Sequence, residues 1–384
     1  MTSTFNDYYY EDFAHPDDQI LNDFSDDLRV IVYYLIPFKL TICIIAFILN
    51  VLHLIIVTRK PFRNNSIYVI MAAITMCDLL VMMTILNGLY VDRIAFFREP
   101  DCWIPFSYCG IIIQFAMSYI QSGLRRLSTW LALLMALVRL LIVKNPLNPS
   151  LSCLSTRPFA IILILILFLA SSIIDFFTAI QYEFVNDGPY RIRYCYYLPR
   201  NYSVPYSWTS RQSQWTDDFR PLAIKYSLMS NAVSKIIPAA TLPILSFLLI
   251  RIMRKAAKSR EKLTKGCKDA EFEKSIRMVA LMTVFSMFAE GVTGIVSAIV
   301  TFYYDYYHIY ASMDLLDAIL INLAVLNAIV HSVICYTVNS QYKEEAGKTI
   351  LWWRKKANKV GTIENQRYPS PTIDRITASN AIID

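Results

Sequence analysis

Several charged side chains lie inside apolar blocks that are long enough to cross a lipid bilayer. A charge at this depth costs about 2.5–3.5 kcal/mol, so it often marks a binding site or an ion path. The chemistry open to such groups is charge recognition, by arginine forks toward carboxylates and by carboxylates toward cations. We expect either a polar pocket for a charged ligand or fixed Arg–Glu pairs that order the bundle. The residues concerned are Asp78, Arg125, Arg126, Arg139, Lys235 and Glu290.

Arg125 and Arg126 are adjacent on one predicted helix. Successive helical residues differ by about 100°, so the two side chains cannot point the same way. One is expected to face a central cavity and the other a neighbouring helix. Arg139 follows 13 residues after Arg126, about 20 Å along the helix. Glu290 and Lys235 are expected at matching depth on two other helices.

A second set of polar residues offers hydrogen bonding at membrane depth. Asn50, Asp78, Asn322 and Asn327 lie within three different apolar blocks. Buried together, they would form one hydrogen-bonded cluster that could hold a sodium ion near Asp78 and bias two states of the bundle. The alternative is hydrogen bonding between helices without an ion, worth roughly 1 kcal/mol per bond.

The sequence lacks the common motifs of metal-binding, redox and nucleotide-binding enzymes. There is no HExxH, CxxC or glycine-rich phosphate loop, and residues 315–338 contain no lysine for a retinal Schiff base. His53, His308 and His331 are scattered along the chain. We interpret His331 as a packing or hydrogen-bonding residue rather than a metal ligand. No enzymatic activity, cofactor or metal other than sodium is expected.

The elements that must position these residues are membrane-spanning helices. The 384 residues are 55% hydrophobic and only 17% charged, whereas soluble domains carry about 25% charged residues. A bilayer needs roughly 20 apolar residues per helix. The sequence predicts an all-α membrane protein with a seven-transmembrane helix bundle. The predicted spans are Val30–Val57, Ile67–Leu89, Ile111–Val143, Phe159–Ile180, Leu222–Ile252, Met278–Phe302 and Leu315–Val338.

The distribution of Lys and Arg predicts the orientation. The loop after the fifth span holds nine of them between Arg251 and Lys274, and the loops after the first and third spans are also basic. Basic loops face the cytoplasm, so the acidic N-terminus lies outside. We expect a multi-pass plasma-membrane protein. Its net charge of +7 then reflects topology, and a nucleic-acid partner is not expected.

The chain divides into four predicted regions. Residues 1–29 form an extracellular tail, residues 30–338 the receptor domain, residues 339–360 an amphipathic helix on the membrane surface, and residues 361–384 a disordered cytoplasmic tail. Trp352 and Trp353 lie among lysines, which is typical of helices that bind anionic lipid headgroups. The absence of internal repeats disfavours a transporter built from duplicated halves.

Outside the membrane, the sequence predicts two covalent modifications. Cys102, Cys109 and Cys195 lie on the outer side, where disulfides form; three is an odd number, so one is left over. Asn201 begins an Asn-Tyr-Ser glycosylation sequon in the outer loop.

Four strings carry a family resemblance. The stretch from Arg125 to Leu131, leading to Leu134–Arg139, looks like helix three of the nematode class W serpentine receptors. Phe288–Gly291, His331–Cys335 and Asn339–Lys343 support the match. These are rhodopsin-like G-protein-coupled receptors, similar to FMRFamide-type neuropeptide receptors. The resemblance extends over all seven spans.

The resemblance implies roles for an activation switch made of Asn50, Asp78, Arg139, Asn327 and His331. Arg139 matches the arginine of the Asp-Arg-Tyr motif, and Asp78 matches the helix-two aspartate of the sodium site. Asn327 matches the asparagine of Asn-Pro-x-x-Tyr, with His331 in place of tyrosine.

The same resemblance implies a disulfide, and it shows one position at which this sequence departs from the family pattern. The family links the top of helix three to the second outer loop, which favours Cys102–Cys195 over Cys109–Cys195. Val292 stands where the family usually has proline, which removes the usual cause of a kink in that helix.

These features predict a receptor that couples to a heterotrimeric G protein. The preferred ligand is a short neuropeptide, for example an amidated one, bound near Arg125, Arg126, Lys235 and Glu290. The main alternative is a chemosensory receptor for environmental small molecules. Weaker alternatives are a transporter or channel, and a receptor that has lost signalling.

Overall fold

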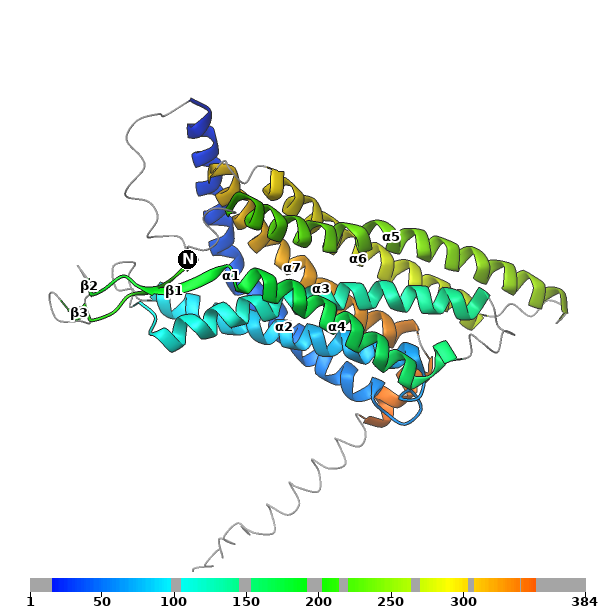
Figure 1. Cartoon of the computed structure of the whole chain (residues 1–384). Helices are drawn as coiled ribbons and strands as arrows, with labels where there is room; N and C mark the ends of the chain where they lie inside the picture. The colour runs from blue at the N-terminus through cyan, green and yellow to red at the C-terminus, as the bar shows by residue number, and fades with distance from the viewer. Residues whose placement is uncertain are drawn as a thin grey trace, which may run out of the picture.

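Seven long helices pack side by side into an elongated bundle in the computed structural model (Figure 1). The structure describes the backbone of residues 16–97, 105–144, 153–191, 202–213, 220–263, 270–302, 307–338 and 340–349. The helices are α1 (Pro16–Val57), α2 (Ser66–Phe97), α3 (Tyr108–Lys144), α4 (Arg157–Ala179), α5 (Arg220–Leu263), α6 (Ala270–Phe302) and α7 (Tyr307–Val338).

Each helix contains one segment that is long and apolar enough to cross a membrane, which confirms the predicted seven-helix bundle. The apolar segments found among the described residues, such as Val30–Val57 in α1 and Ser66–Leu89 in α2, overlap the predicted spans. In a bilayer every backbone polar group must be satisfied internally, and helices achieve this for such segments.

Large apolar side chains are exposed on the outside of the bundle, as a lipid environment requires. Helix α4 is the clearest case: its buried residues are Ala160 and Ser171, while Leu169 and Phe176 are about 60% exposed. Such a surface would be costly in water, at about 25 cal/mol per Å² of apolar area. In lipid it carries no such cost.

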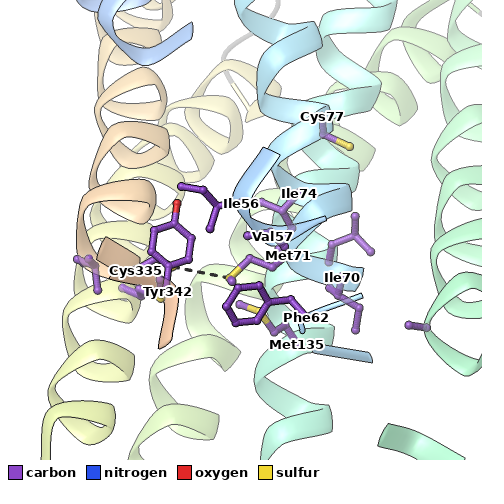
Figure 2. Packing of buried hydrophobic residues seen from close by; sticks show 14 of the residues in the cluster. Ile56, Val57, Phe62, Ile70, Met71, Ile74, Cys77, Met135, Cys335 and Tyr342 are labelled. Atoms are coloured by element: carbon purple, nitrogen blue, oxygen red, sulfur yellow. Dashed lines mark hydrogen bonds between the residues drawn. The ribbon is translucent and has the colours of Figure 1, made fainter. Parts of the chain in front are cut away.

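The largest buried cluster lies between α1, α2, α3 and α7, at the end of the bundle that carries Val57 and Ser66. Figure 2 shows Phe62, Met71 and Met135 packed there against Cys335 and Tyr342. Phe62 is fully buried, so the short connection between α1 and α2 is anchored in the core. A second cluster toward the opposite end joins α1, α2 and α7.

The connection from α4 to α5 contains β-structure, which the sequence analysis did not predict. Strand β1 (Tyr182–Asn186) pairs antiparallel with β4 (Trp208–Gln212), and β2 (Tyr190–Arg191) pairs with β3 (Ser203–Val204). The ribbon projects from one end of the bundle (Figure 1). Its base packs on α3 through ring contacts, for example between Tyr108 and Trp208 at 4.7 Å.

A further helical segment, residues 340–349, follows α7. Tyr342 and Ala346 enter the large buried cluster, and burial raises the pKa of the Tyr342 phenol. On the exposed side, Lys348 bonds Glu344 at 2.8 Å, and this hydrogen bond lowers the pKa of the Glu344 carboxyl. The predicted interfacial tryptophans lie outside the described residues, so the amphipathic helix over 339–360 stays a prediction.

Candidate functional site

A cavity in the middle of the bundle collects half of the predicted intramembrane groups. We call it the central cavity. It has a volume of about 60 Å³, and because a water molecule needs about 10–15 Å³ on this measure, it holds a few waters or a hydrated ion. Its polar lining comes from α2, α3, α6 and α7, and consists of Asp78, Arg125, Ser128, Thr129, Ser286, Glu290, Asn327 and His331.

Charges of both signs face this cavity. Ser128 donates a hydrogen bond to Oδ1 of Asp78 at 2.9 Å. Glu290 is 8% exposed, and Nε and Nη2 of Arg125 are buried without a hydrogen-bond partner among the described residues. Two carboxyl groups and one guanidinium therefore share a poorly hydrated space, where electrostatic interactions are strong.

Arg126 points elsewhere. Its Nη1 forms an ion pair with Oδ1 of Asp175 on α4 at 2.9 Å and donates to the carbonyl oxygen of Ser171 at 3.3 Å. The two helices approach closely here, since a Cβ added at Gly123 would lie 2.0 Å from the Asp175 carboxylate. The structure thus places Arg125 on the cavity and Arg126 against a neighbouring helix.

Lys235 does not share the central cavity with Glu290. Its Nζ donates to the hydroxyl of Ser297 on α6 at 2.9 Å. Ser297 lies seven residues after Glu290, about 10 Å along the helix. The structure thus pairs Lys235 with Ser297, and the matching depth of Lys235 and Glu290 stays a prediction.

The predicted single cluster of asparagines is not formed. Asn50 donates to the carbonyl oxygen of Ala46 at 2.9 Å and accepts from Ser332 of α7 at 3.2 Å. Asn327 accepts from Ser286 of α6 at 3.4 Å, and Asn322 donates within its own helix. Serine hydroxyls, rather than the asparagines themselves, connect the helices.

Arg139 lies half-buried near the end of α3. It is close enough to Cys335 and His331 of α7 and to Tyr68 of α2 to interact with them electrostatically. His331 also contacts His53 of α1, with ring centroids 5.8 Å apart. The predicted switch residues therefore do not form one group. Asp78 and Asn327 line the central cavity, Arg139 lies toward the end of α3, and His331 lines the cavity and also interacts with Arg139.

A second cavity lies nearer the end of the bundle that carries the β-strands. We call it the outer cavity. Amide and hydroxyl groups dominate its lining, and Thr84 donates to Oε1 of Gln121 at 3.3 Å. Ile85 lines both cavities, so they adjoin across this side chain. The other lining residues are Lys39, Asn87, Gly88, Leu89, Gln114, Met117 and Ser118.

Sequence reasoning missed several of these residues although their signal was present. Asp175 and Lys39 are charged residues within predicted spans, which is the criterion that selected Asp78 and Glu290. Gln114 and Gln121 stand seven residues apart on α3 and so share one helical face.

Of the residues predicted to carry the disulfide and the glycan on the outer side, the structure describes Cys109. Cys102, Cys195 and Asn201 lie outside the described residues. Cys109 is a free, exposed cysteine at the start of α3. The Cys102–Cys195 disulfide and the glycosylation of Asn201 stay predictions.

Seven membrane-crossing helices around a polar, charge-bearing cavity are the architecture expected of a seven-transmembrane receptor. A sequence model of the family "Serpentine type 7TM GPCR chemoreceptor Srw" matches residues 37–353. The match covers most of the chain, and the protein belongs to this family. It is a multi-pass membrane receptor of the G-protein-coupled class, not an enzyme. No curated protein matches the chain.

Proposed function

We propose that the protein is a receptor for a short extracellular peptide, one end of which binds in the outer cavity. The observation that carries the proposal is the lining of that cavity. Asn87, Gln114 and Gln121 each offer a carboxamide, and a carboxamide supplies both donors and an acceptor to a peptide bond or a terminal amide. Small-molecule pockets are in general lined predominantly by hydrophobic side chains, so a lining this polar favours a ligand rich in hydrogen-bonding groups.

The size of the outer cavity fits one end of a peptide. Its volume is about 90 Å³, which corresponds to roughly six to nine water positions at 10–15 Å³ each. The remainder of the peptide would lie toward the β-strands. The acidic N-terminal residues Asp7, Glu11, Asp12, Asp17 and Asp18 would raise the local concentration of a basic peptide.

A route from the ligand to the central cavity passes through Ile85. This side chain is 4% exposed and lines both cavities. A ligand that displaces it would change the packing above Asp78. Because packed helices move between discrete arrangements rather than deforming smoothly, we expect two states of the bundle. Ligand would shift their populations through its differential affinity.

Sodium is the proposed occupant of the central cavity. Asp78, Ser128 and Glu290 supply oxygen atoms, which hard cations prefer. With both carboxyl groups ionised opposite the Arg125 guanidinium, one monovalent cation would balance the charge of the lining. Sodium-dependent thermal stability of the purified receptor, absent in Asp78→Asn, is the expected result. Equal stability in sodium and in N-methylglucamine buffers would contradict this assignment.

The opposite end of the bundle is the proposed surface for the G protein. Arg139 lies there, and the basic loop after α5 provides positive charge. By the positive-inside rule this end is cytoplasmic and the N-terminus is extracellular. Protease protection of an N-terminal epitope tag in intact cells tests the orientation: the tag should be cleaved without permeabilising the plasma membrane.

The ligand assignment is tested by saturation binding and G-protein dissociation in transfected cells challenged with a library of short amidated peptides. Gln114→Leu should weaken the response to an active peptide by at least about tenfold, the effect of losing a hydrogen bond of roughly 1.4 kcal/mol. Ser172→Leu, on the exposed face of α4, is the matched control and should respond like the parent. Equal responses of both variants would refute the outer cavity as the binding site.

The family name favours a second candidate, a chemoreceptor for small molecules. The polar outer cavity would then take a water-soluble metabolite. A response to metabolites alone, lost in Gln114→Leu, would establish this candidate and exclude the peptide.

A further inference from the structure

Three soft or borderline metal ligands converge at the end of the bundle near Val57 and Val338. They are His53 of α1 and His331 and Cys335 of α7. One ligand atom from each lies within 4.8 Å of the other two. His331 and Cys335 are four residues apart on α7 and therefore share one face of the helix.

The imidazole of His53 is arranged as a metal ligand would be. The residue is 1% exposed, and its Nε2 has no hydrogen-bond partner among the described residues. Its other nitrogen, Nδ1, lies 2.8 Å from the hydroxyl of Tyr342. In metal sites the second ring nitrogen almost always makes such a bond, which fixes the ring and leaves the first nitrogen free to coordinate.

A fourth ligand stands beside the thiol. Sδ of Met71 on α2 is 3.8 Å from Sγ of Cys335, and Figure 2 shows the two sulfur-bearing side chains facing each other across the buried cluster. Two ligand atoms on one metal, with bonds of about 2.0–2.3 Å, stand roughly 3.3–3.8 Å apart. The three primary atoms thus need to close by at most about 1–1.5 Å, which side-chain rotation provides.

We propose that His53, His331, Cys335 and Met71 form a binding site for monovalent copper. Two imidazoles, a thiolate and a thioether are the ligand types that soft first-row cations select. On binding, Cu⁺ replaces the thiol proton of Cys335, which is released, and no electron is transferred. The cytoplasm keeps free cysteines reduced, so the thiol is available under the proposed topology.

Charge decides between Cu⁺ and Zn²⁺. One thiolate neutralises Cu⁺, whereas Zn²⁺ on the same ligands would leave one positive charge. Arg139 already places a positive charge beside His331 and Cys335. A second uncompensated charge in this buried, low-dielectric region would be strongly unfavourable.

Bound copper would tie α1 and α7 together, with α2 joined through Met71. These helices meet at this end mainly through apolar packing. A coordinate bond among them would restrict movement of the end of α7 beside Arg139. Metal binding itself needs neither agonist nor G protein, so its test stands apart from the test of the proposed function.

The experiment uses the purified full-length receptor in lipid nanodiscs, under reducing and oxygen-free conditions. Cu⁺ is titrated against a chromophoric Cu⁺ chelator, and copper is counted by elemental analysis. The expected result is one Cu⁺ per chain. X-ray absorption at the copper edge should show two nitrogen ligands and one or two sulfur ligands. No binding, or a site that takes Zn²⁺ but not Cu⁺, would overturn the proposal.

Variants separate the site from general damage. Cys335→Ser should lower Cu⁺ affinity by more than the roughly 10–100-fold that loss of a second-shell bond costs, and Tyr342→Phe should fall within that range. Cys77→Ser, which changes another buried thiol of the same cluster, is the matched control and should bind like the parent. Met71→Leu keeps the packing volume and should remove one sulfur from the absorption spectrum. Unchanged affinity in Cys335→Ser would refute the site.

Discussion

The ion pair between Arg126 and Asp175 offers a stability test in which the two partners are expected to behave differently. The Arg126 side chain is 5% exposed and that of Asp175 is 18% exposed. Removing one partner of a buried pair costs about 3–5 kcal/mol, because the other charge is left uncompensated. The carboxyl group can escape this cost by taking up a proton, whereas the guanidinium stays charged in proteins.

Asp175→Asn is therefore expected to destabilise the receptor more than Arg126→Met. We expect about 3 kcal/mol for Asp175→Asn and about 1–2 kcal/mol for Arg126→Met, which leaves a buried polar group unpaired. At about 2 °C per kcal/mol, the melting temperature of the nanodisc-embedded receptor should fall by roughly 6 °C and 2–4 °C. The double variant should recover most of the loss, because no charge remains unpaired. A larger effect for Arg126→Met, or strictly additive losses, would refute this reasoning.

The remaining predictions concern packing and hydrogen bonding between helices. Gly123→Ala should lower surface expression, because its Cβ would lie 2.0 Å from the Asp175 carboxylate and would displace that side chain from Arg126. Gly88→Ala, with no atom within 4 Å of the added Cβ, should express normally. Flow cytometry on intact cells distinguishes the two variants, and equal expression would contradict the close α3–α4 approach. Ser332→Ala should lower stability by about 1 kcal/mol, because the Oδ1 of buried Asn50 loses its donor from α7; an unchanged melting temperature would show that this bond contributes nothing.

The helices could be predicted from the sequence because hydropathy and length alone identify membrane-spanning segments. All seven predicted spans overlap the apolar segments of the described helices. Helix geometry predicted that the side chains of Arg125 and Arg126 point in different directions, but it did not predict which of them faces the cavity. Which of them faces the cavity depended on Asp175, a residue far away in the sequence.

The side-chain contacts between helices could not be predicted from the sequence. Asn50 and Asn327 were expected to join Asp78, yet each bonds a serine on another helix. Serine in a span can bond its own backbone or a neighbour, and nothing in the sequence distinguishes the two. The pairing of β1 with β4 was equally hidden, since its register is set by a long connection between the strands.

The cluster of His53, His331 and Cys335 shows the same limit. The two residues on α7 have the spacing of one helical face, but the third ligand comes from the other end of the chain. Packing of α1 against α7 brings them together. The interpretation of His331 as a packing residue is consistent with its contact with His53, and coordination would give it a further role.

The most direct test of the receptor account is G-protein dissociation in cells that express the full-length chain. The parent should give a saturable, ligand-dependent response, and Arg139→Ala should lose it at equal surface expression. Ser172→Leu, on the exposed face of α4, is the control and should respond like the parent. A saturable response that survives in Arg139→Ala would contradict the assigned switch. Transport of ions or solutes in the absence of any G-protein response would contradict the account as a whole.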